Sequence, residues 1–165
     1  MEPRSMLEKL ILYFVYQTNS FLTKIQLVKF LYLADLYSVK WTGKQLTALD
    51  WYYYNYSPWQ EDIDVALVDL NGQVVQTQKG ENTLIKMGAK PLALQTLGIS
   101  QGLCFVLDNI CIEWARSSTD KNKGLLEYIS TTAPILAVKG KYHSSDKVPL
   151  NLALEQELLF EVLAV

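Results

Sequence analysis

The densest group of side chains that could perform acid–base chemistry is a run of four acids, Glu61, Asp62, Asp64 and Asp69. Paired carboxylates can serve as a general acid and a general base. The same acids also fall in and after the expected first turn of a helix, where the positive end of the helix dipole stabilises negative charge. We therefore interpret them as solvated helix charges and assign them no catalytic role.

Cysteine and histidine are too few, and too far apart, for most metal and nucleophile chemistry. Cys104 and Cys111 are seven residues apart in one expected helix, so about 10 Å separates them along its axis, beyond the reach of a disulfide. We expect two buried, reduced thiols. His143 is the only histidine, so neither a Cys/His metal cluster nor a Ser-His-Asp or Cys-His catalytic set can form within the first 140 residues. His143 itself is predicted to lie in an exposed loop.

The Gly-containing segments match no phosphate-binding motif, which leaves nucleotide binding without support. From these observations we predict no catalytic residue, no metal site and no cofactor.

Asp35 differs from the other acids because it lies in the middle of an apolar helical segment, next to Leu31, Tyr32 and Leu36. An unpaired carboxylate buried there would be costly, so Asp35 needs tyrosine hydroxyls, a lysine or backbone donors as partners. A structural role and a binding contact both remain open. A third hypothesis pairs Asp35 with Lys29 as a buried acid and base of an enzyme, but the two residues are six apart and point in different directions on the helix.

Aromatic side chains crowd the segment that precedes the acids. An alternating strand could not turn all of them inward: Tyr52, Tyr53, Tyr54, Tyr56 and Trp59. Tyrosine and tryptophan dominate protein interfaces, so the outward ones predict either a protein-binding surface or packing beneath neighbouring helices. Stacking on single-stranded nucleic acid would require a basic groove, yet no Lys or Arg occurs between Lys44 and Lys79.

Two helices are expected near the start of the chain. Ser5, with Glu8 three residues later, predicts the start of a helix over 6–16. Thr23 and Gln26 predict a second helix that runs to about Lys40 and is closed by Gly43. Apolar side chains cover nearly the full circle of this second helix, which makes it the candidate central helix: Ile25, Val28, Phe30, Leu31, Leu33, Leu36 and Val39.

The rest of the chain alternates turn signals with short periodic segments. A strand is expected at 49–56, followed by a helix that runs to 70, with Ser57 as N-cap, Pro58 in its first turn and Gln60 three residues after the cap. A β-hairpin of 74–78 and 83–87 and a short helix at 92–97 come next. Two more helices are expected at 101–116, capped by Ser100, and at 123–131. Residues 150–165 could be helix or strand. The sum is mainly α with a small antiparallel β-sheet or hairpin, an α+β fold, in a single compact domain over 1–165.

Composition narrows the function further. Half of the 165 residues are apolar and 19% are charged, which is typical of a folded chain. A net charge of −2 disfavours non-specific binding to nucleic acid or anionic lipid. Apolar runs stop well short of the roughly 20 residues that span a bilayer, and the first residues show no basic segment followed by an apolar run and a cleavage site, so we expect no signal peptide. We expect a cytoplasmic protein with no membrane partner.

Four stretches have a familiar pattern: residues 22–35, 42–46, 51–52 and 56–58. Together they resemble the Panacea domain of the SocA-like family of antitoxin and phage-associated proteins. Matching positions are Lys29, Tyr32, Ala34 and Asp35 in the helix, Gly43 and Leu46 in the turn after it, and Pro58 before the next helix. Ser57 stands where the family usually has glycine. Residues 125–134 are similar to a later family stretch but lack its histidine and tryptophan. With this stretch included, the resemblance covers about 22–134.

The resemblance implies a bacterial or phage-encoded antitoxin, not an enzyme, that neutralises a cognate toxin by direct binding; the toxin is usually encoded by a neighbouring gene. We expect the partner-binding surface to include Lys29, Asp35, Tyr52, Tyr54, Tyr56 and Trp59. The alternative is an adaptor or regulatory protein of phage origin, with an enzyme or a nucleic-acid-binding regulator less favoured. Homo-oligomerisation is left open.

Overall fold

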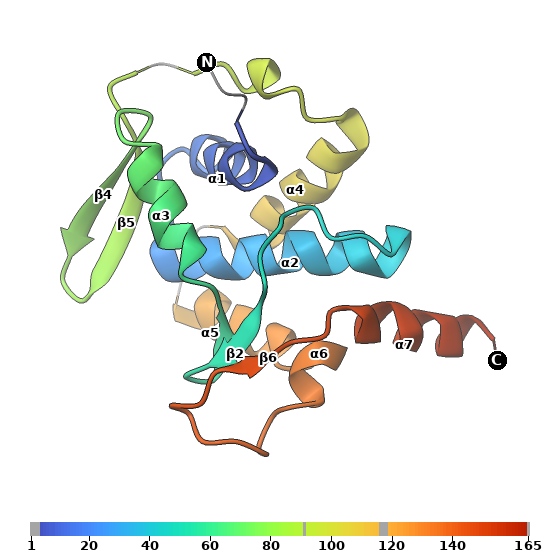
Figure 1. Ribbon diagram of the computed structural model, residues 1–165. Coiled ribbons are helices and arrows are strands. Elements are labelled where there is room, and N and C mark those ends of the chain that lie inside the picture. Colours follow the sequence, from blue (N-terminus) through green and yellow to red (C-terminus); the bar gives the residue numbers. More distant parts are fainter. Residues whose placement is uncertain (1–3, 91, 116–118, 165) are drawn as a thin grey trace.

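The central element forms where the sequence carries its strongest helix start signal. The computed structural model describes residues 4–90, 92–115 and 119–164, with the backbone alone for 119–122, and helix α2 (Lys24–Thr42) runs through its middle (Figure 1). The Thr23 hydroxyl accepts a hydrogen bond from the Gln26 amide at 3.1 Å, and the Gln26 side chain accepts one from the Thr23 amide at 2.9 Å. Gly43, in the left-handed region at φ 77°, ends the helix. Both predicted ends of the central helix are confirmed to within two residues.

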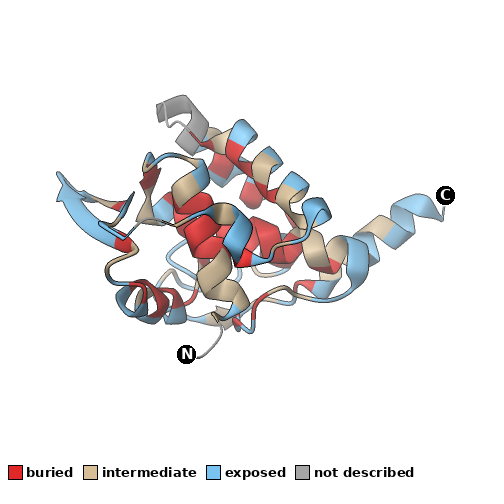
Figure 2. Cartoon of the chain, turned by 90° about the horizontal axis from the view of Figure 1, so that it is seen from above, coloured by how far each residue is buried: buried red, intermediate tan, exposed pale blue. Residues whose placement is uncertain are grey.

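Burial of α2 on nearly all sides is also confirmed. Phe30, Leu31 and Tyr32 in its middle are fully buried, and Figure 2 shows the buried residues gathered at the centre of the molecule. Ile25 is the exception to the predicted apolar set, because 56% of it is exposed. It lies in the first turn of the helix.

Three helices lie on one side of α2 in Figure 1: α1 (Met6–Gln17) and α4 (Gln101–Trp114) pack against it, and α3 (Asp62–Asp69) packs against α1. The predicted Ser5–Glu8 capping box at α1 is confirmed. Ser100 caps α4 as predicted, by accepting a hydrogen bond from the Leu103 amide at 3.3 Å. The predicted end of this helix at residue 116 lies outside the described residues.

Three more helices lie on the opposite side: α5 (Thr119–Ile129), α6 (Ala133–Leu136) and α7 (Ala153–Leu163). The prediction of 123–131 for α5 was late by a few residues at the start and by two at the end. The open choice for 150–165 is answered by a helix, and this helix has no buried residue. It packs against α2 and α6, and its C-terminal end extends away from the body of the molecule (Figure 2).

One of the two small sheets contains the predicted hairpin. Strands β4 (Val74–Lys79) and β5 (Asn82–Met87) pair antiparallel with Val74 opposite Met87 and Lys79 opposite Asn82, which confirms the prediction to within one residue. Strand β1 (Leu22–Thr23) pairs with β5, so the order is β1-β5-β4. The short helix expected at 92–97 is a 3-10 helix, η1 (Leu94–Leu97).

The second sheet, of order β3-β2-β6, corrects one prediction. Strands β2 (Tyr52–Tyr54), β3 (Ser57–Trp59) and β6 (Val148–Pro149) form it. The expected helix start at Ser57 and Pro58 is therefore wrong, because both residues belong to β3 and the helix begins only at Asp62. Pro58 is tolerated because β3 is an edge strand, where one missing N–H donor interrupts no inner ladder.

Together, the described residues form an α+β fold of seven α-helices and two small antiparallel sheets around one hydrophobic core, as the sequence predicts. Both cysteines are free; Cys111 is buried and Cys104 is partly exposed, so the expectation of buried thiols holds fully only for Cys111. Of the helices in the described ranges, none has the length and apolar character needed to cross a bilayer.

Candidate functional site

Asp35 lies in the core, with no exposed surface, and accepts four hydrogen bonds. The amides of Leu46 and Thr47 donate to its Oδ1, each at 3.0 Å. The Thr47 hydroxyl, at 2.5 Å, and the Trp51 indole Nε1, at 2.8 Å, donate to Oδ2. Burial raises the pKa of this carboxyl, while the four donors oppose that shift. Every donor comes from the segment that follows α2, so Asp35 fastens this segment to the helix.

This geometry separates Asp35 from the predicted binding surface. Its backbone donors were expected, whereas the Thr47 hydroxyl and the Trp51 indole were not. Asp35 has no exposed surface, so it lies beneath the predicted binding surface and holds the backbone that carries it.

Four of the six predicted binding residues, Lys29, Tyr54, Tyr56 and Trp59, line one hollow of about 530 Å³. We call this hollow the aromatic groove. The first turns of α2 provide one wall with Ile25, Val28 and Lys29; the β2–β3 hairpin provides the other with residues 54–59; α5 adds Leu126.

The tip of the hairpin places an aromatic side chain at an unusual backbone position. Tyr54 pairs with Ser57, so Asn55 and Tyr56 form a two-residue turn, with φ 50° and 66°. Asparagine tolerates such a turn, but a left-handed conformation costs a residue such as tyrosine roughly 1–2 kcal/mol relative to glycine. The Tyr56 side chain is nevertheless 64% exposed.

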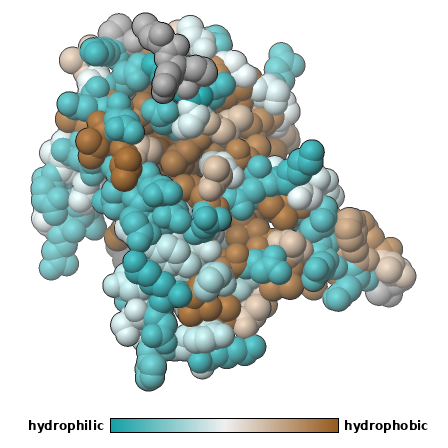
Figure 3. Space-filling view, viewed as in Figure 1, coloured by the Kyte–Doolittle hydropathy of each residue, from teal (hydrophilic) through white to brown (hydrophobic). Residues whose placement is uncertain are grey.

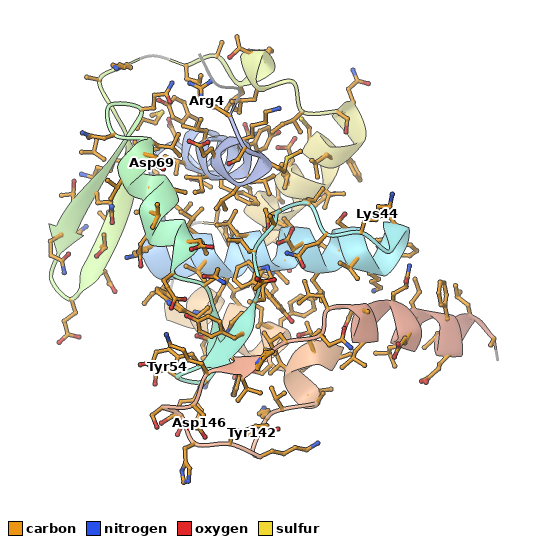
Figure 4. The ribbon with its side chains drawn as sticks, in the orientation of Figure 1. Arg4, Lys44, Tyr54, Asp69, Tyr142 and Asp146 are labelled. Atoms are coloured by element: carbon orange, nitrogen blue, oxygen red, sulfur yellow. The ribbon has the colours of Figure 1, made fainter. Side chains whose placement is uncertain are left out.

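A clamp of charged and aromatic groups holds the hairpin from outside. Glu61 accepts a hydrogen bond from the Tyr52 hydroxyl and pairs with the Lys147 ammonium at 2.9 Å. The Lys147 Nζ lies 5.3 Å from the centre of the Tyr52 ring and 6.0 Å from that of Tyr54. The hydrogen bond from Lys147 lowers the pKa of Glu61. Figure 4 shows Tyr54 on this hairpin near the loop that carries Tyr142 and Asp146.

Tyr52 therefore belongs to this clamp and not to the wall of the groove. The clamp was missed by sequence reasoning, because Lys147 is 86 residues away from Glu61 and no local pattern joins them.

Of the described residues that line the aromatic groove, Lys29 is the one with a charged side chain. It is half-buried, and burial lowers the pKa of its ammonium group. Among the described residues it has no hydrogen-bond or ion-pair partner. The nearby Lys24 is paired with Asp64, and its Nζ lies 6.0 Å from the centre of the Trp59 ring.

A second, larger hollow of about 700 Å³ lies between the end of α2 and α4. Its apolar residues include Trp41, Phe105 and Ile112, which are 67%, 70% and 75% exposed. Figure 3 shows further apolar side chains on α7, at the right of the view. This hollow was not predicted from the sequence. The available signal was that Phe105 and Ile112 fall outside the apolar face of α4, the face made by Leu107 and Ile110.

Acidic, cysteine and histidine side chains do not converge in the described part of the chain: no three of them are placed to hold a metal ion. His143 is exposed in a loop, as predicted.

Comparison with known proteins gives one match. The family model described as antitoxin SocA-like, Panacea domain, matches residues 27–123. This range contains Lys29, Asp35 and the whole β2–β3 hairpin. Searches of curated proteins and of solved structures each gave no match.

Proposed function

The chain belongs to the SocA-like antitoxin family with a Panacea domain, and on this basis we propose that it neutralises a toxin by binding it directly. The toxin is a protein encoded by a neighbouring gene of the same bacterial or phage genome. The aromatic groove is the binding site, with Lys29, Tyr54, Tyr56 and Trp59 as contact residues. Tyr52 positions the hairpin, and Asp35 maintains the fold beneath it.

The observation that carries this proposal is the backbone position of Tyr56. An exposed aromatic residue at φ 66° costs stability where a glycine would not, and nothing in the core requires it. Strain of this kind concentrates at functional sites, where the surrounding structure holds it in place. Tyrosine and tryptophan are also the side chains that contribute most to protein–protein binding.

The environment of Asp35 favours binding over catalysis. The only buried carboxylate in the described part of the chain already accepts four hydrogen bonds from its own segment. Lys29 is not among the hydrogen-bond partners of Asp35, and it faces the groove. The hypothesis of a buried acid and base therefore lacks the proximity that proton transfer requires.

Co-expression with the product of the adjacent gene tests the proposal. We expect growth rescue and co-purification with the wild-type chain, and loss of both with Tyr54→Ala and Trp59→Ala. Tyr142→Ala is the matched control, since Tyr142 is exposed on the loop after α6 and does not line the groove. Circular dichroism checks that each variant is folded. A toxic neighbour that the wild-type chain fails to neutralise or bind would contradict the proposal and favour an adaptor or regulatory role.

A further inference from the structure

Lys29 presents a positive charge in the aromatic groove with nothing opposite it. An ammonium group removed from water is costly unless it is paired, and the described residues supply no partner. A helical surface position elsewhere would hold a lysine fully solvated. In the isolated chain, the positive charge of Lys29 therefore has no counter-charge among the described residues.

Two carboxylates close to the hairpin are already engaged. Asp64 is paired with Lys24, and Glu61 is paired with Lys147 and accepts from Tyr52. In the part of the chain that the structure describes, no carboxylate pairs with Lys29, so we look to another molecule for the anion.

The walls of the groove describe the rest of that molecule. Val28 and Pro58 are buried, Trp59 is partly buried, and Ile25 and Tyr56 are exposed at the rim. Apolar side chains of a partner fit such a surface, because the contact removes apolar surface of both the groove and the partner from water. One unpaired ammonium next to it matches one carboxylate.

A polyanion fits less well. Lys24 is paired with Asp64, and the acids Glu61 and Asp62 follow directly after the hairpin, so the groove is not surrounded by an excess of positive charge. Nucleic acid and phosphate esters require several cations in one groove.

We infer that the aromatic groove receives a segment of a protein partner in which an aspartate, glutamate or chain-terminal carboxylate lies beside apolar side chains, and that Lys29 pairs with this carboxylate. The inference rests on the proposed function for the identity of the partner, but the recognition chemistry is independent of it. A charge pair of this kind sets specificity, since a partner without the acid leaves Lys29 unpaired.

Selection of short random peptides, displayed on phage, tests the chemistry without the toxin. The immobilised baits are the wild-type chain, Lys29→Met, Lys29→Arg and Lys86→Met, a lysine-to-methionine control on the exposed strand β5. Peptides that also bind a Trp59→Ala bait are discarded, because their binding does not depend on the groove. We expect the wild type, Lys29→Arg and Lys86→Met to select acids next to apolar residues. Lys29→Met is expected to keep the apolar preference and lose the acidic one.

A selected peptide is then synthesised with its acid and with the matching amide. The wild type is expected to bind the acid form at least about tenfold more tightly, and Lys29→Met to bind both forms equally. The inference is overturned if groove-dependent peptides show no acidic preference, if Lys29→Met retains it, or if no peptide depends on Trp59.

Growth rescue separates this inference from the proposed function. Rescue that survives Lys29→Glu would remove the role of Lys29 and leave the antitoxin proposal standing. Acid-dependent peptide binding without growth rescue would support the role of Lys29 and contradict the antitoxin proposal.

Discussion

The indole Nε1 of Trp51 donates a hydrogen bond to Asp35 Oδ2 at 2.8 Å, and this bond joins the start of the aromatic hairpin to the centre of α2. The Trp51 ring also packs edge-on against Tyr32, with 5.6 Å between ring centres. Both residues are buried. The carboxylate is thus a structural element of the site, one layer below the surface that we propose to bind the toxin.

Asp35→Asn should destabilise the fold by about 2 kcal/mol or more. In the wild type each buried donor faces a carboxylate oxygen, whereas in the variant some of them would face the amide nitrogen, which cannot accept a hydrogen bond. Trp51→Phe removes one of the four bonds and should cost about 1–3 kcal/mol. Urea unfolding measures both, and the double variant tests their coupling. An Asp35→Asn protein as stable as the wild type would contradict the role assigned here.

Tyr56→Gly should stabilise the isolated chain by roughly 1 kcal/mol while weakening toxin neutralisation. Glycine after Asn55 is the preferred residue for a two-residue turn with both φ values positive, and it removes an exposed aromatic contact. Thermal unfolding and growth rescue measure the two effects separately. A loss of stability, or rescue equal to the wild type, would show that the tyrosine is there for the fold.

Lys29→Met should also stabilise the free chain at pH 7, by about 0.5–1 kcal/mol. Burial lowers the pKa of Lys29 below its ordinary 10.5, so the folded state holds the charged form less favourably than the unfolded state does. The penalty is complete below the folded pKa and disappears as the pH rises to 10.5, where the unfolded chain also loses the proton. The stability gap between variant and wild type should therefore narrow with rising pH. A gap that widens would contradict the burial of the ammonium group.

Cys111 should resist alkylation in the native protein. Burial, with a smaller contribution from the charge of Asp108, raises the pKa of its thiol to about 12. The thiol is then protonated at pH 8, and a protonated thiol is a poor nucleophile. Iodoacetamide at pH 8, followed by mass spectrometry, should find Cys111 unmodified until urea is added. Equal modification rates with and without urea would show that the helix α4 is not packed as described.

Local signals predicted the elements that are determined locally. The capping boxes at Ser5 and Thr23 and the hairpin around Gly80 depend on residues a few positions apart, and each was confirmed. At Ser57 the local signals of a helix start were equally clear but were overridden. Pairing of Tyr53 with both Pro58 and Val148 draws the segment into a sheet, and Val148 is too distant in the sequence to appear in any local pattern.

The candidate site was predictable in its residue types but not in its assembly. The excess of aromatic residues indicated that some must face outward, and Tyr54 and Tyr56 do. That Lys29 lies across the groove from Trp59 depends on how α2 packs against the hairpin. For Asp35, the apolar helix around it predicted that the carboxylate is buried. Its hydrogen bond from Trp51 was not predictable, because it depends on how the folded chain returns to α2.

The most direct test of the central claim is the affinity of the purified chain for the product of its neighbouring gene, measured by calorimetry on three proteins. The wild type and Trp41→Ala, which alters the larger hollow, should bind equally well. Trp59→Ala, which alters the aromatic groove, should bind at least about tenfold more weakly. Equal binding by Trp59→Ala, or a loss confined to Trp41→Ala, would contradict the aromatic groove as the toxin-binding site.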